Sequence, residues 1–321
     1  MESIKCFGRD EDRDMKIAIF GKMTNNWGLE GNIVRASVGR EDIFISDLKI
    51  FNEGDYFTTG KYASSEEYGA LVFLQGRNID RERLGKERRK KILWNAEFLP
   101  YKGFEKNKEA QARLAMIEPL EDFDLILNGC PLSTEFLKEK RGLNIKWFPM
   151  MGVDPSFHRN LEIEKDVDIG FYGVPCPRRI RIWNDLLKLA KQHSYSPLNL
   201  VWKQVYGEDL IQFINQTKVM LNLHYSDLLN TESRIYEILG CGGFCLSEPL
   251  SLQGKFLNGI HLEECSDGEA EFDSIVQRAI TIVNHQEGYA KRIAQNGYEY
   301  VHKEVSISKV LERLQGEIRS L

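Results

Sequence analysis

Short apolar segments alternate with longer, more polar segments through most of this 321-residue chain, and the pattern starts twice. Strands that are buried on both faces of a sheet have nearly continuous apolar sequences. When helices separate such strands, the pattern is typical of a parallel sheet covered on both sides. The length is sufficient for two domains of about 100–150 residues each. The sequence therefore predicts two doubly wound α/β domains in tandem, facing a cleft between them.

The first half begins with the apolar segment 15–20, which leads into Gly21 and a polar loop. A helix is expected over 33–38. Further strands are expected over 43–46, 70–74, 92–95 and 125–128. The second half restarts with a strand at 169–172, which leads into Gly173. It continues with a helix at 179–189 and with strands at 198–202, 219–224 and 244–246.

Proline and glycine interrupt the pattern over 148–160, which indicates a junction between the two halves. Near the end of the chain, apolar residues recur at helical spacing over 307–318 and predict an amphipathic helix. We therefore expect an N-terminal domain over 1–152, a C-terminal domain over 153–304, and a final helix within 305–321.

Composition limits the class of protein. Apolar residues make up 42% of the chain and charged residues 28%, as in soluble globular proteins. No apolar run reaches the roughly 18–20 residues that a membrane span needs, and the charged segment 1–14 does not resemble a signal peptide. A cytoplasmic protein without an integral membrane segment is expected. The six cysteines are scattered without a C-x-x-C pair, so reduced and mostly buried thiols are expected.

Several common cofactor signatures are missing from the sequence. It has neither G-x-G-x-x-G after the first strand nor a Walker motif, which disfavours nicotinamide and P-loop enzymes. Its three D-x-D triplets, which begin at residues 12, 122 and 166, are interpreted as solvated acids because the last two precede strands. No metal ion and no cofactor are expected.

The segment 230–249, N-T-E-S-R-I-Y-E-I-L-G-C-G-G-F-C-L-S-E-P, predicts a short helix followed by a buried strand. Asn230 or Thr231 can cap the helix, and glycines end it. Arg234 and Glu237 are three residues apart and project from one face near the helix N-terminus, where unpaired N–H groups favour phosphate. The pair therefore suggests a diphosphate and a ribose diol, although a solvated surface pair is the alternative.

Ligands of open α/β sheets bind beyond the carboxyl ends of the strands, so site residues are expected directly after strands. The candidates at these positions are Gly21, Glu97, Gly173, Trp202, His224 and Arg234.

The arrangement resembles glycosyltransferases of the GT-B architecture, and within them it is similar to the CgeB-type spore-maturation group. The matching segments are 221–224 (L-N-L-H), 234–244 (R-I-Y-E-I-L-G-C-G-G-F), 168–173 (D-I-G-F-Y-G) and 147–155 (W-F-P-M-M-G-V-D-P). The same segments also look like the DNA β-glucosyltransferases of T-even phages. The final helix resembles the GT-B segment that crosses back onto the N-terminal domain.

The resemblance implies that Arg234 contacts the diphosphate of a nucleotide sugar, that Glu237 contacts the ribose, and that Glu97 is the catalytic base. Many retaining GT-B enzymes carry another glutamate eight residues before the ribose-binding one. Here that position is Leu229, and Glu232 is nearby but out of register, so the retaining pattern is incomplete.

An acceptor hydroxyl must lose its proton as it attacks, and all six histidines lie beyond the N-terminal domain, which leaves Glu97 as the best-placed base there. Arg178 and Arg179, with Arg234 and the helix N-terminus at Ser233, could neutralise the leaving diphosphate without a metal. Trp202 and Lys203 follow a strand where a nucleobase would lie, although core packing is the stronger interpretation of Trp202. His224 could approach the donor phosphate or be a core histidine.

The expected activity is a glycosyltransferase of the hexosyltransferase type. It would use a nucleotide sugar, with a UDP-linked sugar expected, as co-substrate and would invert the anomeric centre. The acceptor stays open among a glycan, a small molecule and modified DNA. Segment 77–91 holds eight basic residues against three acids and could grip DNA phosphates in a phage-type enzyme, or could be a solvated helix. A non-catalytic nucleotide-sugar-binding protein and a nucleotide-sugar epimerase are further alternatives.

Overall fold

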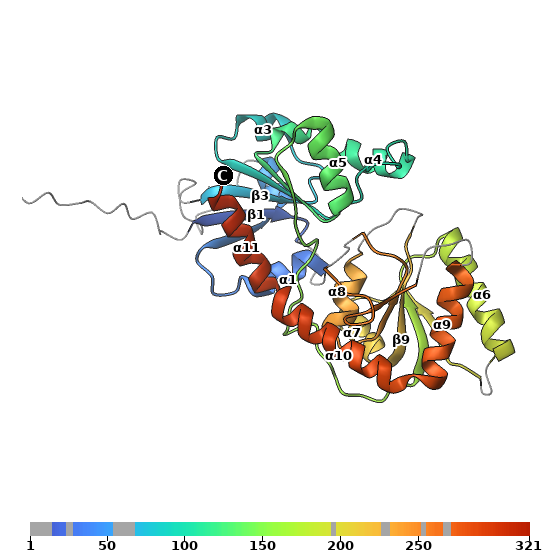
Figure 1. Cartoon of the computed structure of the whole chain (residues 1–321). Coiled ribbons are helices and arrows are strands. Elements are labelled where there is room, and N and C mark those ends of the chain that lie inside the picture. The colour runs from blue at the N-terminus through green and yellow to red at the C-terminus, as the bar shows by residue number, and fades with distance from the viewer. Residues whose placement is uncertain are drawn as a thin grey trace, which may run out of the picture.

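The chain folds into two α/β domains, each built on one parallel sheet (Figure 1). The structure is a computed structural model that describes residues 15–23, 28–53, 68–193, 197–225, 232–251, 255–265 and 271–321. Cys6, Asp12, Asp14, Leu229, Asn230 and Thr231 lie outside the described residues.

The N-terminal domain has a six-stranded sheet of order β2-β1-β3-β4-β5-β6, in which every pairing is parallel. Its strands are β1 (Lys16–Gly21), β2 (Ile43–Asp47), β3 (Tyr68–Leu74), β4 (Lys90–Asn95), β5 (Leu125–Asn128) and β6 (Ile145–Trp147). Its helices are α1 (Gly28–Ala36), α2 (Leu48–Glu53), α3 (Arg81–Lys86), α4 (Lys108–Ile117), the 3-10 turn η2 (Leu120–Asp122) and α5 (Pro131–Arg141).

The C-terminal domain has a five-stranded parallel sheet of order β11-β10-β9-β7-β8. Its strands are β7 (Val167–Tyr172), β8 (Leu200–Lys203), β9 (Thr217–Asn222), β10 (Cys245–Ser247) and β11 (Glu263–Glu264). Its helices are α6 (Pro177–His193), α7 (Gly207–Asn215), α8 (Ser233–Gly240), α9 (Glu271–His285) and α10 (Glu287–Glu304), and α11 (Ile307–Arg319) ends the chain.

Apolar strands produce this fold because both faces of each sheet are covered. In β1, Ile17 and Ile19 belong to one buried cluster, whereas Ala18 and Phe20 belong to another on the opposite face. Successive side chains of a strand point to opposite faces, so a continuous apolar run fits a sheet with helices on both sides. The predicted doubly wound α/β architecture is confirmed.

Several predicted boundaries were wrong. The first helix, α1, begins at Gly28 and ends at Ala36, whereas 33–38 was expected, because Gly28 and the apolar Leu29 already form its first turn. Strand β9 ends at Asn222, so His224 lies beyond it. Strand β6 was not predicted, since three residues are too few for a recognisable apolar run. The five described cysteines are buried free thiols, as predicted.

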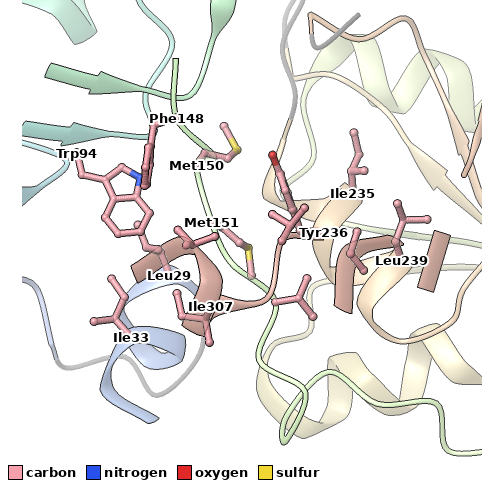
Figure 2. Close-up of a cluster of buried hydrophobic side chains, with 14 of the residues drawn as sticks. Leu29, Ile33, Trp94, Phe148, Met150, Met151, Ile235, Tyr236, Leu239 and Ile307 are labelled. Atoms are coloured by element: carbon pink, nitrogen blue, oxygen red, sulfur yellow. The ribbon is translucent and has the colours of Figure 1, made fainter. Parts of the chain in front are cut away.

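One apolar cluster joins the two domains (Figure 2). It runs from Trp94 and Phe148 at the N-terminal sheet, through Met151 of the connecting segment, to Tyr236 of α8. Ile307, at the start of α11, lies in the middle of this cluster. The N-terminal domain, the connecting segment and α8 therefore share one buried core.

Helices α10 and α11 follow one another from the C-terminal domain to the N-terminal domain (Figure 1). Gln315 of α11 donates a hydrogen bond to Asp42 at 2.7 Å, and Glu317 pairs with Lys146 at 2.7 Å. These two contacts attach α11 to the N-terminal domain. Among the described residues, no helix is both long enough and apolar enough to cross a bilayer.

Gly152 allows the connecting segment and α11 to cross closely. A Cβ atom at Gly152 would lie 2.6 Å from the Cα atom of Ile307, a distance that no side chain tolerates. At the same crossing, the amide of Ile307 donates to the carbonyl of Val153 at 2.7 Å. Only glycine fits here, because its lack of a side chain lets two backbones approach.

Candidate functional site

Each sheet contains two adjacent strands from which the chain continues toward opposite edges of the sheet. In open α/β sheets a crevice forms between the carboxyl ends of such strands. In the C-terminal domain these strands are β7 and β9, and in the N-terminal domain they are β1 and β3. The loops after these strands lie on the sides of the two domains that face each other (Figure 1).

Gly173, the residue after β7, makes room for two arginines. Its φ of 141° is one that residues with side chains rarely adopt. A Cβ atom there would lie 2.9 Å from Nη2 of Arg234 and 3.3 Å from Nη1 of Arg179. The structure thus brings together three residues that the sequence placed in the donor site.

Arg234 is buried between the ends of the two central strands. Its guanidinium donates to the carbonyl of Tyr172 at 3.0 Å and to the side-chain oxygen of Asn222 at 2.9 Å. It also donates to the carbonyl of Leu223 at 3.2 Å. These bonds hold the guanidinium at the point where β7 and β9 diverge.

Arg179, in the first turn of α6, donates to the carbonyl of Leu223, which also accepts from Arg234. The residue is 3% exposed, and its guanidinium donates to this carbonyl at 2.7 and 3.1 Å. Burial lowers its pKa from the ordinary value for arginine, and the charge of Arg234 acts in the same direction. Two like charges therefore lie close together in a site with little solvent.

Glu232 is the carboxylate that both arginines share. Its Oε2 lies 2.7 Å from Nη1 of Arg234 and 3.2 Å from Nη2 of Arg179. Burial by itself would raise the pKa of Glu232, but Arg234, His224 and Arg179 together hold it well below its usual range. Glu232 is also the residue that precedes α8. Its role was not predicted, because Glu232 is out of register with the glutamate spacing of retaining GT-B enzymes.

His224 has a buried ring nitrogen, Nδ1, without a hydrogen-bond partner, and this atom lies near Glu232. Its Nε2 is 2.7 Å from the carbonyl of Pro249, which assigns the proton to Nε2. Its Nδ1 is buried without a hydrogen-bond partner and lies 3.9 Å from Glu232. Burial alone would lower the pKa of His224, but the nearby Glu232 and Glu248 raise it above its ordinary value. His224 therefore adds a potential positive charge to the arginine cluster.

The helix that begins at Ser233 presents its N-terminus beside these side chains. The first N–H groups of a helix have no acceptor within the helix, and the helix dipole favours an anion there. Ser233 itself is exposed. An anion that reached this point would meet the helix end together with the arginines.

Glu237 and Arg178 have other partners than the sequence suggested. Glu237 is 8% exposed and accepts a hydrogen bond from the Tyr172 hydroxyl at 2.7 Å, and burial raises its pKa. Arg178 forms a two-point ion pair with Glu248. The structure thus places Arg178 beside the donor cluster but with its charge already balanced.

Trp202 and Lys203 lie at the end of β8. The indole nitrogen of Trp202 donates to the carbonyl of Gly173 at 2.9 Å, and its ring packs edge-on against Phe171. Core packing thus describes Trp202, and it also supports the Gly173 turn. Lys203 is exposed, and its ammonium lies 4.9 Å from the centre of the Phe213 ring.

Glu97 follows β4 in the N-terminal domain and is held by two arginines. Its Oε1 pairs with Arg77 and its Oε2 with Arg113 of α4. Arg113 also contacts Glu109 at 2.9 Å. Both oxygens of the predicted base are therefore occupied by guanidinium groups. Gly21 ends β1 and packs against Leu74, to which a Cβ atom would come within 2.9 Å.

Comparison with known proteins agrees with this architecture. Residues 162–316 match the protein-family model described as glycosyl transferase-like. The structure of HepE from Anabaena, in complex with UDP and glucose, has a TM-score of 0.65 at 14% identity, covering 96% of this chain and 100% of HepE. Sucrose-phosphate synthase from Thermosynechococcus elongatus has a TM-score of 0.65 at 12% identity, covering 95% and 98%. The fold is GT-B.

A third GT-B structure matches a smaller part of this chain. The pneumococcal O-GlcNAc transferase GtfA, solved with UDP and GlcNAc, has a TM-score of 0.55 at 11% identity, covering 78% of this chain and 56% of that protein. A search of curated protein sequences found no significant match. The GT-B prediction is confirmed, whereas the similarities to the CgeB-type group and to phage DNA β-glucosyltransferases stay predictions.

Four of the eight basic residues in segment 77–91 of this GT-B chain pair with acidic side chains among the described residues. Only Arg81–Lys86 is helical. Besides the Arg77–Glu97 pair, Arg81 donates to the carbonyl of Ile117 at 2.6 Å. Lys86 pairs with Glu82, and Arg89 pairs with Glu87. Half of the basic side chains that a DNA backbone would need therefore already have an acidic partner.

Proposed function

We propose that this protein is a glycosyltransferase that binds a UDP-linked sugar at the carboxyl edge of the C-terminal sheet. The observation that carries the proposal is the meeting of Arg179 and Arg234 above Gly173, with the N-terminus of α8 beside them. Paired guanidiniums and helix N-termini are the groups that bind a diphosphate. The glycosyl transferase-like match over the same residues supports this assignment.

In this proposal the diphosphate binds next to Glu232, between the two arginines and His224. When the sugar leaves, negative charge grows on the β-phosphate, and fixed cations in a buried site stabilise that charge. His224 would donate from Nδ1 once protonated, which its raised pKa favours. Because the protein supplies these cations itself, we propose that turnover needs no metal ion.

UDP is the proposed nucleotide because the related folds HepE and GtfA were solved with UDP. The acceptor would be a hydroxyl compound bound on the N-terminal domain. Direct attack of that hydroxyl on the anomeric carbon would invert the configuration. An acceptor of duplex DNA is disfavoured by the ion pairs of segment 77–91.

The test is to incubate the protein with UDP-, ADP- and GDP-sugars and to measure released nucleoside diphosphate. At 100 times its dissociation constant, UDP should stabilise the fold by about 2.7 kcal/mol, which raises the melting temperature by several degrees. Arg179→Met should remove this shift, whereas the matched change Arg319→Met, at an exposed position of α11, should keep it.

The outcomes separate the alternatives. Binding of UDP-sugars without any release, with or without candidate acceptors, would indicate a non-catalytic binding protein. Conversion of the sugar while it stays attached to UDP would indicate an epimerase. Salt-sensitive binding to duplex DNA would favour the phage-type alternative. A failure of every nucleotide to bind would refute the proposal.

A further inference from the structure

A buried carboxyl group, that of Glu30, lies at the point of the N-terminal sheet that corresponds to the donor cluster. Glu30 is in the first turn of α1, the helix that follows β1. Glu30 is only 8% exposed. Gln75, which follows β3, donates to its Oε1 at 3.3 Å. Glu30 therefore sits between the carboxyl ends of β1 and β3, where the chain leaves in opposite directions.

Helix α1 is fixed on the side of its domain that faces the C-terminal domain (Figure 1). Asn32 donates to the carbonyl of Gly152 at 2.7 Å, and Arg35 pairs with Asp154, both in the connecting segment. Leu29 and Ile33 pack into the cluster shared by the two domains (Figure 2). Glu30 is thus held on a rigid element between the two sheets.

The surroundings of Glu30 differ from those of Glu97. Within the described part of the chain Glu30 forms no ion pair, and the side chain that donates to it is the neutral amide of Gln75. Lys22, after β1, is the charged group that faces it, and Arg35 on its own helix is bound to Asp154. Glu97, in contrast, has a guanidinium on each oxygen. A carboxylate held in that way is poorly available to accept a proton.

A buried carboxyl without a counter-ion is normally avoided, because burial penalises the charged form. Burial indeed raises the pKa of Glu30 from its ordinary value, with a hydrogen bond from its own backbone amide and the charge of Lys22 acting in the opposite direction. Such an arrangement destabilises the folded protein at neutral pH and strengthens the carboxylate as a base. Both effects are typical of catalytic carboxyls.

We propose that Glu30 is the catalytic base on the acceptor side, an inference that rests on the glycosyltransferase function proposed above. The acceptor oxygen forms a bond to the anomeric carbon, and its proton moves to the carboxylate of Glu30. The bond from the anomeric carbon to the β-phosphate oxygen breaks, and its electron pair leaves with UDP. Glu97, bound to Arg77 and Arg113, would then be a positioning residue for the acceptor edge.

The experiment uses UDP-glucose with water as the acceptor, because water must also lose a proton as it attacks. Glu30→Gln should lower kcat about 100-fold or more, as expected for removal of a general base. The thermal shift produced by UDP should be unchanged, since the donor site lies in the other domain. The rate of the unmodified protein should rise with pH through a pKa above that of a free glutamate, and this step should disappear in Glu30→Gln.

The melting temperature distinguishes a catalytic role of Glu30 from a structural one, because the two roles predict opposite changes in Glu30→Gln. Glu30→Gln removes a buried charge, so the melting temperature should rise, by about 1–3 °C. The matched change Glu82→Gln, at an exposed position of α3, should alter neither rate nor stability. If Glu30 only supported the fold, its replacement would lower the melting temperature and leave the pH profile in place.

Two further outcomes identify what has failed. If Glu30→Gln hydrolyses UDP-glucose within about threefold of the unmodified rate, the base assignment is wrong, while UDP binding still supports the proposed function. If Glu97→Gln instead abolishes turnover and removes the pH step, Glu97 is the base. If the unmodified protein neither binds UDP nor hydrolyses UDP-glucose, the proposed function itself fails.

Discussion

The carboxylate of Glu232 lies 2.7 Å from Nη1 of Arg234, and both groups are largely buried at the start of α8. Arg179 approaches the same carboxylate oxygen at 3.2 Å. A protein carboxylate therefore lies beside the position in which the proposed function places the negative charge of a diphosphate. Two of the following predictions concern this cluster.

Replacing Arg234 with methionine should destabilise the fold by about 3 kcal/mol, because it leaves Glu232 buried with only part of its positive partners. Urea unfolding followed by circular dichroism measures this change. Arg319→Met, which removes an exposed arginine, should stay within about 0.5 kcal/mol of the unmodified protein. A loss as small as that of the control would show that the Glu232–Arg234 pair contributes nothing net to stability.

Replacing Glu232 with glutamine should tighten UDP binding, because it removes a negative charge beside the proposed diphosphate position. A three- to tenfold decrease in Kd is expected, equivalent to about 0.7–1.4 kcal/mol, and isothermal titration calorimetry would measure it. Glu299→Gln, at an exposed position of α10, serves as the charge-matched control. Weaker binding would mean that Glu232 is needed to orient the guanidiniums rather than competing with the ligand.

Stability should depend on pH through His158. Burial holds the pKa of His158 at about 4, below its ordinary value of about 6.5. The folded protein keeps the ring neutral while the unfolded chain takes up a proton below about pH 6.5. The free energy of unfolding should therefore fall as the pH drops from about 6.5 to about 4, with His158 contributing about 2–3 kcal/mol.

Urea unfolding of His158→Asn and of the unmodified protein at several pH values isolates this contribution. The variant should be less stable at pH 7 but should lack the part of the decrease that arises from His158. His285→Asn, at an exposed position, should keep the full decrease. Parallel pH curves for His158→Asn and the unmodified protein would contradict the assignment.

Replacing Gly152 with alanine should destabilise the protein by about 2–3 kcal/mol, because the new methyl group collides with the backbone at Ile307. The melting temperature measures the effect. Gly316→Ala, in the exposed part of α11 with no atom near the added Cβ, should instead raise stability by up to about 1 kcal/mol. Equal effects at the two glycines would refute the close crossing of the connecting segment and α11.

Much of the architecture follows from local patterns. The apolar runs of β1, β3, β4 and β5 are recognisable because each is buried on both faces of its sheet. Strand β6 and the early start of α1 were missed. Three residues do not show a period, and the start of α1 depends on packing against the connecting segment.

The donor site, too, could be predicted from the sequence only in part. Gly173, Arg179 and Arg234 were predicted from their positions after strands and at helix starts, and they do come together. Their partners were not predicted, because ion pairs form between side chains that are distant in sequence. Arg178 pairs with Glu248, seventy residues away, and nothing local distinguishes it from Arg179.

The sequence by itself determined two parallel α/β units and a charged helix start after the ninth strand, since burial on two faces and helix capping are read from neighbouring residues. The tertiary structure decided which charges are free. It paired Glu97 with two arginines, left Glu30 buried beside a neutral amide, and set Glu232 between Arg179 and Arg234. The physical reason is that the charge state and availability of a side chain depend on burial and on partners that only the folded chain brings within contact.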